Sequence, residues 1–234
     1  LKKENPKACM KCKQAMVKLK MMYKSSKYIS FERGDLGLLH KLFPDFTIVD
    51  KTAFPRRKHA KDFDFLWENL SDSEKAEHQK GAVKNWLEFG FGQIVAPPRS
   101  GKTILGVAIA TELKTKVAVI AHQEELLKQF YNTFCKFTNI KEVEKLNFKP
   151  LIKINPRMNE VDDLEVCLFT YQQFISKKGR ERLKEIKNKF GLVIVDEVHR
   201  SSANIFSKVV GRINSKHRLG LTATPTRKDG HHFK

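Results

Sequence analysis

The sequence lacks long apolar runs, and it lacks a recognisable export signal. No stretch approaches the roughly 20 apolar residues that a membrane-spanning helix needs, and the chain does not open on a basic segment followed by an apolar one. These absences exclude the common classes of membrane and secreted protein. We therefore expect a soluble intracellular protein, in the cytoplasm or, in a eukaryote, the nucleus, with no membrane partner.

Cysteine is scarce. The four cysteines, Cys9, Cys12, Cys135 and Cys167, are irregularly spaced and do not form a disulfide framework, which favours a reducing compartment. Cys9 and Cys12 have the spacing of half a Zn²⁺ site, but no second Cys or His pair follows at zinc-finger distance. A zinc half-site and a basic arm with two incidental cysteines are equally good interpretations.

Acidic residues are also in short supply. The chain has 45 Lys and Arg against 26 Asp and Glu, a net charge of +19 with a sequence pI near 9.8. A surplus of this size indicates a polyanionic partner held through phosphate contacts. Greater solubility or a positive membrane-surface patch are alternatives, but nucleic acid is favoured.

The length of 234 residues suits one α/β domain with a smaller appendage. We expect a basic arm at 1–27, a small α+β accessory segment at 28–70 and the main domain at 71–234. A helix is expected to start at Ser71, with Glu74 completing a capping box, and to end at Gly90.

Beyond Gly90, apolar runs alternate with helix-like stretches. Strands are expected at 92–96, 116–121, 165–170, 191–196 and 217–222, with helices at 103–114, 123–137, 171–187 and 203–211. Near-continuous apolar strands are typical of a parallel sheet covered on both faces. The sequence therefore predicts a doubly wound parallel α/β fold with its chemistry at the carboxyl ends of the strands.

The segment Ala96–Thr103 lies between an apolar strand and a helix-like stretch, and it ends in Gly-Lys-Thr. This order lets backbone N–H groups and a helix N-terminus converge on phosphate oxygens. Lys102 is expected to reach the β- and γ-phosphates, and the Thr103 hydroxyl to bind Mg²⁺. The predicted nucleotide-binding residues of this loop are Pro98, Arg99, Ser100, Gly101, Lys102 and Thr103.

A pair of carboxylates, Asp196 and Glu197, follows the apolar run 191–195. Asp196 is expected to hold the Mg²⁺ shell, and Glu197 to polarise the water that attacks the γ-phosphate. Together with Lys102, they are the predicted catalytic residues. The combination of this pair with the loop at 96–103 predicts hydrolysis of a nucleoside triphosphate.

Polar clusters follow three other strands. Each can be a helix cap or a turn when taken alone. Together, and in this order with the two nucleotide motifs, they resemble the first motor domain of superfamily 2 helicases. The clusters are His122-Gln123, Thr170-Tyr171-Gln172 and Thr222-Ala223-Thr224.

The Asp-Glu-Val-His box at 196–199 resembles the DExH type, and the stretches 191–199 and 220–230 resemble the XPB-like and UvsW-like branch, which is similar to type III restriction subunits. The resemblance covers about residues 75–234. It implies a RecA-like P-loop NTPase fold, ATP and Mg²⁺ as ligands, and nucleic acid as partner, DNA more than RNA. It also implies a second RecA-like domain in the intact protein.

The resemblance also assigns roles to residues outside the nucleotide motifs. It implies that Gln79 reads the adenine edge and that His199, with Thr222 and Thr224, couples the nucleotide to the bound strand. A surface glutamine and a capping histidine are the alternatives. It further implies that one nucleic-acid strand is contacted by His122, Gln123, Thr170, Tyr171 and Gln172.

Arg99 departs from the family pattern, which has glycine at this position. Arginine is costly where the backbone needs a positive φ, so either the loop differs locally or the guanidinium reaches a phosphate or a carboxylate. No second motor domain is recognisable in the chain, so we expect weak ATP binding and slow turnover by this segment. A double-stranded DNA translocase that does not unwind, a nucleic-acid-binding module without turnover and a small-molecule kinase remain alternatives.

Overall fold

The computed structural model describes residues 23–24, 29–30, 62–196 and 209–223, and the chain divides into two compact units, 1–52 with 234 and 53–233. The described part of the first unit is one antiparallel pair, β1 (Tyr23–Lys24) with β2 (Ile29–Ser30). Cys9 and Cys12 lie outside the described residues. No helix in the described ranges has both the length and the apolar character that crossing a membrane requires.

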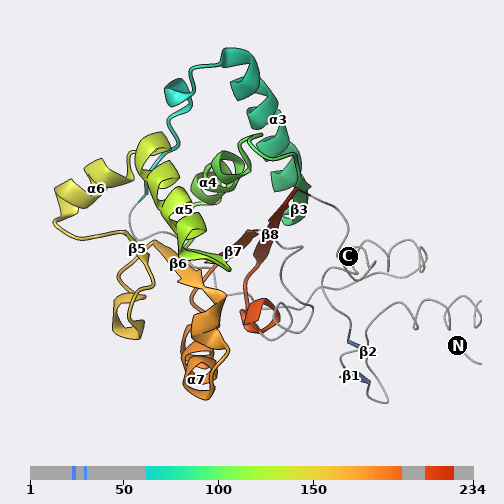
Figure 1. Cartoon of the computed structure of the whole chain (residues 1–234), viewed down its shortest axis with the longest axis vertical. Helices are drawn as coiled ribbons and strands as arrows, with labels where there is room; N and C mark the ends of the chain where they lie inside the picture. The colour runs from blue at the N-terminus through green and yellow to red at the C-terminus, as the bar shows by residue number, and fades with distance from the viewer. Residues whose placement is uncertain (1–22, 25–28, 31–61, 197–208, 224–234) are drawn as a thin grey trace, which may run out of the picture. The chain divides into compact units, whose positions relative to one another are not determined.

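The second unit is built on a six-stranded, all-parallel sheet (Figure 1). The spatial order is β3-β8-β7-β4-β6-β5, so successive strands are joined by crossovers that place all carboxyl ends at one edge. The strands are β3 (Phe91–Val95), β4 (Val117–Ala121), β5 (Ile152–Ile154), β6 (Val166–Thr170), β7 (Leu192–Asp196) and β8 (His217–Thr222). The predicted α/β fold is confirmed.

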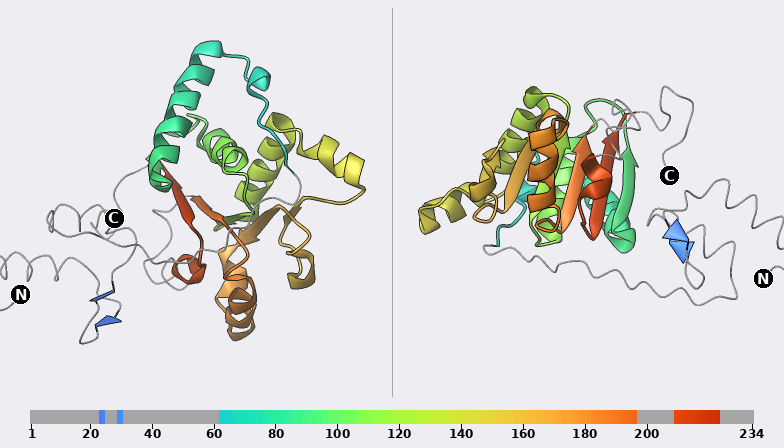
Figure 2. Two further views of the ribbon diagram at one scale, coloured as in Figure 1. Left: turned by 180° about the vertical axis from the view of Figure 1, so that it is seen from behind. Right: turned by 90° about the horizontal axis from the view of Figure 1, so that it is seen from below.

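Helices cover both faces of this sheet (Figure 2). On β4, Val117 and Val119 belong to the core cluster on the side of α4 (Lys102–Glu112) and α5 (Glu124–Phe137). Ala118 and Ile120 belong to a second cluster, which includes Leu183 of α7 (Lys177–Ile186). Alternation along one strand thus fills two cores, which is why the strands are apolar throughout.

Helix α3 (Ser73–Phe89) begins one residue later than the sequence suggested, because the Asp72 side chain, not Ser71, accepts a hydrogen bond from the Lys75 N–H. Its end is as predicted: Gly90 adopts a left-handed conformation with φ 68°. A side chain at Gly90 would also collide with the His217 ring. Both the positive φ and this close contact therefore favour glycine.

The segment 62–70, before α3, is part of the second unit and packs into its core. Phe63 is 1% exposed, and the Phe65 ring stacks on Phe137 at a centroid distance of 6.1 Å. The Leu66 N–H donates to the Phe137 carbonyl at 2.8 Å, just before the short 3₁₀ helix η2 (Trp67–Asn69). These contacts fix the carboxyl end of α5.

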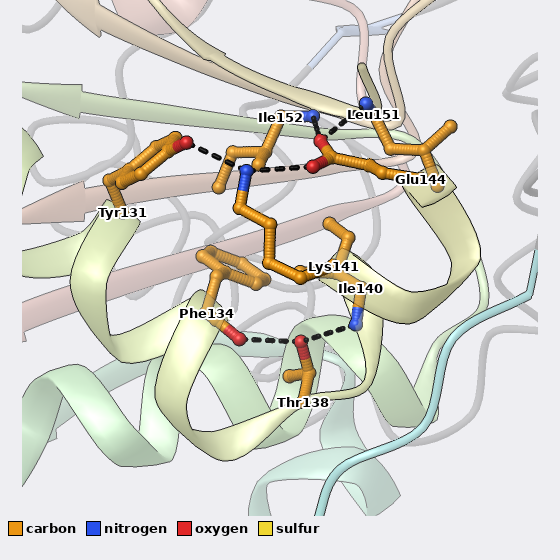
Figure 3. Close-up of polar contacts among 8 residues, drawn as sticks. All are labelled: Tyr131, Phe134, Thr138, Ile140, Lys141, Glu144, Leu151 and Ile152. Atoms are coloured by element: carbon orange, nitrogen blue, oxygen red, sulfur yellow. Dashed lines mark hydrogen bonds and ion pairs between the residues drawn. The ribbon is translucent and has the colours of Figure 1, made fainter. Parts of the chain in front are cut away.

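Helix α6 (Ile140–Asn147) and edge strand β5 were not predicted from the sequence. The Glu144 carboxylate ties them together (Figure 3): it accepts hydrogen bonds from the Leu151 and Ile152 N–H groups at 2.7 and 3.2 Å and pairs with Lys141 at 2.7 Å. Burial lowers the pKa of Lys141, but hydrogen bonds to Glu144 and Tyr131 raise it above its ordinary value.

The continuous helix expected at 171–187 is wrong. A 3₁₀ turn, η4 (Tyr171–Phe174), comes first, and α7 starts anew after Ser176, whose hydroxyl accepts from the Gly179 N–H at 2.9 Å. The side-chain cap and the close packing of Gly179 on η4 impose the break. Other short 3₁₀ helices are η3 (Met158–Glu160) and η6 (Val210–Arg212), and most of the helix expected at 203–211 lies outside the described residues.

Candidate nucleotide site

The Gly-Lys-Thr loop joins the carboxyl end of β3 to the first turn of α4. A tight turn forms where the Ser100 N–H donates to the Pro97 carbonyl at 3.3 Å, and Gly101 then takes a left-handed conformation with φ 89° as the N-cap of α4. The first N–H groups of a helix have no partner within the helix, and they carry partial positive charge. The start of α4 therefore supplies backbone donors suited to phosphate.

Lys102 lies across this loop. Its ammonium donates to the carbonyl oxygens of Ala96 at 2.9 Å and Pro97 at 3.0 Å. These bonds hold the cation at the loop, where a bound phosphate would face it. An ammonium has three donors, so one proton stays available for a phosphate oxygen even with both carbonyl contacts in place.

Arg99 adopts a positive φ, which is costly for a residue other than glycine. Its φ is 64°, and the side chain is exposed. A non-glycine residue in this region costs of the order of 1 kcal/mol or more. The loop therefore keeps its left-handed geometry in spite of the arginine.

Gln79 on α3 lies directly under the loop and is 4% exposed. Its Nε2 donates to the Ser100 carbonyl at 3.3 Å, and a Cβ on Gly101 would collide with that nitrogen. The Gln79 Oε1 is buried without a hydrogen-bond partner. In this geometry the amide braces the phosphate loop, and it keeps one acceptor unused.

Asp196 is the last residue of β7 and is 9% exposed. It aligns with Leu221 of β8, while Val95, just before the loop, aligns with Thr222 of the same strand. One strand thus separates the loop from the carboxylate, a distance of about 10 Å at ordinary strand spacing. Both elements lie at the same edge of one sheet. Glu197, His199 and Thr224 lie outside the described residues.

The residues that could hold a magnesium ion are Thr103, in the first turn of α4, and Asp196. No group of three or more His, Cys, Asp or Glu side chains suited to a metal occurs in the part of the chain that the structure describes. Mg²⁺ bound to a nucleotide uses only one or two protein ligands, because phosphates and waters complete its octahedron. One hydroxyl and one carboxylate therefore fit that ion.

Two further predicted clusters meet at the same edge. β4 and β6 are neighbours, with Ala121 aligned to Thr170. The Gln172 side chain donates to the His122 carbonyl at 2.7 Å, which links the two strand ends directly. Gln123 is exposed at the N-cap of α5, whereas Tyr171 packs against the second core cluster.

Asn155, at the same edge, was not among the predicted site residues. It follows β5 with φ 48°, and its Oδ1 accepts from the Thr170 N–H at 3.1 Å. Asparagine tolerates the left-handed region, so an Asn after Ile-Lys-Ile was the available signal. The exposed cations Lys177, Lys178 and Arg180 at the start of α7, next to η4, were also not singled out.

Residues 72–227 match the protein family described as "Type III restriction enzyme, res subunit". Among curated proteins, the chain is 31% identical over 176 residues to "Putative helicase 22" of Sulfolobus islandicus filamentous virus, covering 69% of this chain and 30% of that protein. It is 33% identical over 160 residues to "DNA 3'-5' translocase XPB2" of Sulfurisphaera tokodaii, covering 68% and 33%. The chain thus spans about a third of these relatives.

Among solved structures, the UvsW helicase from bacteriophage T4 matches with a TM-score of 0.55 at 16% identity, covering 82% of this chain and 70% of that one. At 16% identity, this match supports the fold and nothing further.

Proposed function

This chain belongs to the family of the type III restriction enzyme res subunit, and from that premise we propose that it is the ATP-binding motor half of an ATP-driven nucleic-acid helicase or translocase. The membership and the XPB-type relatives confirm the resemblance to the superfamily 2 branch. The observation that carries the proposal is the placement of the Gly-Lys-Thr loop and Asp196 at one edge of one sheet.

In the proposed reaction, the loop backbone and Lys102 bind the triphosphate of ATP. Mg²⁺ supplies charge neutralisation at the phosphates when bound, held by Thr103 and Asp196. Glu197 accepts the proton of the attacking water. Gln79, which braces the loop from below, also faces the base through its remaining amide capacity. These roles are proposed from the position of each residue in the motifs; the Lys102 contacts and the position of Asp196 at the strand end support them.

We propose that one strand of DNA crosses the carboxyl ends of β4 and β6. Support comes from the Gln172–His122 hydrogen bond, which joins the predicted contacts Gln123 and Thr170–Gln172 into one surface. The net charge of +19 favours a polyanion. DNA is preferred to RNA because several relatives are named DNA helicases or translocases, against one that is named an RNA helicase.

We also propose that Thr222 and Thr224 couple the nucleotide to the strand together with His199. Thr222 supports this directly, because its carbonyl accepts the Ala96 N–H at 3.0 Å and it therefore contacts the start of the phosphate loop. A shift of the loop on ATP binding would therefore displace the end of β8.

Since the chain spans about a third of its curated relatives, the intact protein is proposed to contain a second RecA-like domain that closes over the nucleotide. The name "translocase" of one relative keeps movement along duplex DNA without strand separation as the second candidate. A binding module without turnover is disfavoured by the intact Lys102 and Asp196 positions.

ATP hydrolysis by the full-length protein, measured with single-stranded DNA, duplex, branched DNA and RNA, tests the proposal. DNA should raise the rate more than RNA does. A strand-separation assay beside a triplex-displacement assay then distinguishes unwinding from translocation. No stimulation by any nucleic acid would reject the motor assignment.

A further inference from the structure

The phosphate loop of this chain is poor in backbone donors. Pro97 and Pro98 have no N–H group, the Ala96 N–H is bonded to the Thr222 carbonyl at 3.0 Å, and the Ser100 N–H is turned onto the Pro97 carbonyl at 3.3 Å. In the stretch 96–100, the remaining N–H belongs to Arg99. Phosphate loops bind through successive backbone N–H groups. The part of this loop next to β3 therefore offers a phosphate fewer donors.

Arg99 sits where glycine would be free of strain. Its φ of 64° lies in the region that glycine adopts without cost, yet the chain places a large side chain there and leaves it exposed. No hydrogen bond or ion pair ties the side chain to the described part of the molecule. A strained residue with no structural partner is the kind of outlier from which a functional role is inferred.

We infer that the Arg99 guanidinium binds the triphosphate of the nucleotide and replaces the donors that Pro97 and Pro98 remove; this inference rests on the proposed function. A guanidinium presents five N–H donors in a planar fork that matches phosphate oxygens in pairs. It supplies more than the two missing N–H groups.

Position favours the nucleotide over the nucleic acid as the ligand of Arg99. The loop follows β3, whereas the His122–Gln172 surface lies at the ends of β4 and β6, three and four strands along the sheet. At ordinary strand spacing these ends are about 14 and 19 Å from that of β3. The triphosphate held by Lys102 lies against the loop itself.

The test is the dissociation constant of Mg-ATP, measured by calorimetry on the 234-residue chain for wild type, Arg99→Gly and Arg99→Lys. Arg99→Gly should bind about tenfold more weakly, the lower end of the contribution of a charged hydrogen bond. Its melting temperature should be equal or higher, because the backbone strain is relieved. Arg99→Lys should fall between the two.

Two controls separate the possible failures. Lys145→Ala removes one exposed charge on α6, far along the sequence from the loop, and should bind Mg-ATP as wild type does. Lys102→Ala should abolish binding; if it binds as wild type does, or if wild type does not bind, the proposed function fails with the inference. If Arg99→Gly alone keeps wild-type affinity, or loses only affinity for DNA, the inference is overturned and the proposed function stands.

Discussion

Individual residues of the phosphate loop are held by specific contacts, and one of them is strained. Lys102 is held by two carbonyls beside the proposed phosphate position, while Gly101 must stay small because the Gln79 amide lies where its Cβ would be. Arg99 accepts backbone strain in the same short segment. The conformation of the loop is therefore constrained by its contact with Gln79 and by its two prolines, Pro97 and Pro98.

Lys102→Ala should abolish ATP binding, because the cation that meets the phosphates is lost. Glu197→Gln should bind ATP like wild type and fail to hydrolyse it, since the amide cannot accept the proton of the water. Equilibrium binding and single-turnover hydrolysis measure the two effects. Lys84→Ala, an exposed lysine on α3, is the control; wild-type turnover by Glu197→Gln would show the carboxylate assignment to be wrong.

Gln79→Ala should weaken ATP binding and reduce the preference for ATP over GTP. The first effect follows from losing the bond to the Ser100 carbonyl, and the second from the proposed contact with adenine. Affinities for both nucleotides measure this. An equal loss for ATP and GTP would mean that the glutamine braces the loop and does not read the base.

At this scale the sequence predicted which residues gather at the site but not how some of them are held. The strained φ of Arg99 could be anticipated, because the family pattern has glycine there. The burial of Gln79 could not, since it depends on how α3 packs under the loop. Asn155 was missed because its strand has only three residues and gives a weak periodic signal.

Elements with a clear periodicity were predictable, and those defined by tertiary contacts were not. The strands β4 and β7 were evident as apolar runs. The pair α6 and β5 was not, because a helix rich in Lys and Glu depends on Glu144 bonds to the strand that follows it. The break before α7 likewise depends on the Ser176 cap, which a continuous helical pattern conceals.

Glu144→Ala should reduce the free energy of unfolding by about 1–3 kcal/mol, because it leaves two backbone N–H groups and the Lys141 ammonium without this partner. Urea denaturation measures the change. Glu142→Ala on the exposed side of the same helix should stay within about 0.5 kcal/mol. Equal effects would show that the Glu144 network does not stabilise β5.

A variant with Gln at all three positions, Lys177, Lys178 and Arg180, should show a weaker salt dependence of binding to single-stranded DNA. The plot of log affinity against log salt concentration should become less steep by about 2, if each cation contacts a phosphate. The cations lie beside η4, which carries Tyr171 and Gln172. The matched control replaces Lys75, Lys80 and Lys84 of α3, which are also exposed. The same decrease in both variants would mean that net charge alone binds DNA.

At the scale of the whole molecule, the six-stranded sheet explains why distant segments cooperate. The loop after β3, Asp196 of β7 and the ends of β4 and β6 lie along one edge of the sheet because all six strands are parallel. One edge thus carries both the proposed nucleotide site and the proposed nucleic-acid surface. The end of β8 lies between the loop and the carboxylate, where it can respond to both.

The 234-residue chain should hydrolyse ATP about 10³–10⁵ times more slowly than the full-length protein with DNA, because the proposed second domain supplies the arginine that stabilises the transition state. Steady-state rates of the two proteins at equal concentration test this. Full DNA-stimulated turnover by the 234-residue chain alone would refute the need for a second domain.

The most direct test of the central claim is the effect of Mg²⁺ on ATP affinity in wild type, Asp196→Asn and Thr103→Val. If the loop and the strand end share one metal–nucleotide complex, Mg²⁺ should tighten ATP binding to wild type, and each substitution should remove most of that gain while metal-free binding persists. An undiminished Mg²⁺ effect in Asp196→Asn would place the carboxylate outside the nucleotide site and contradict the account.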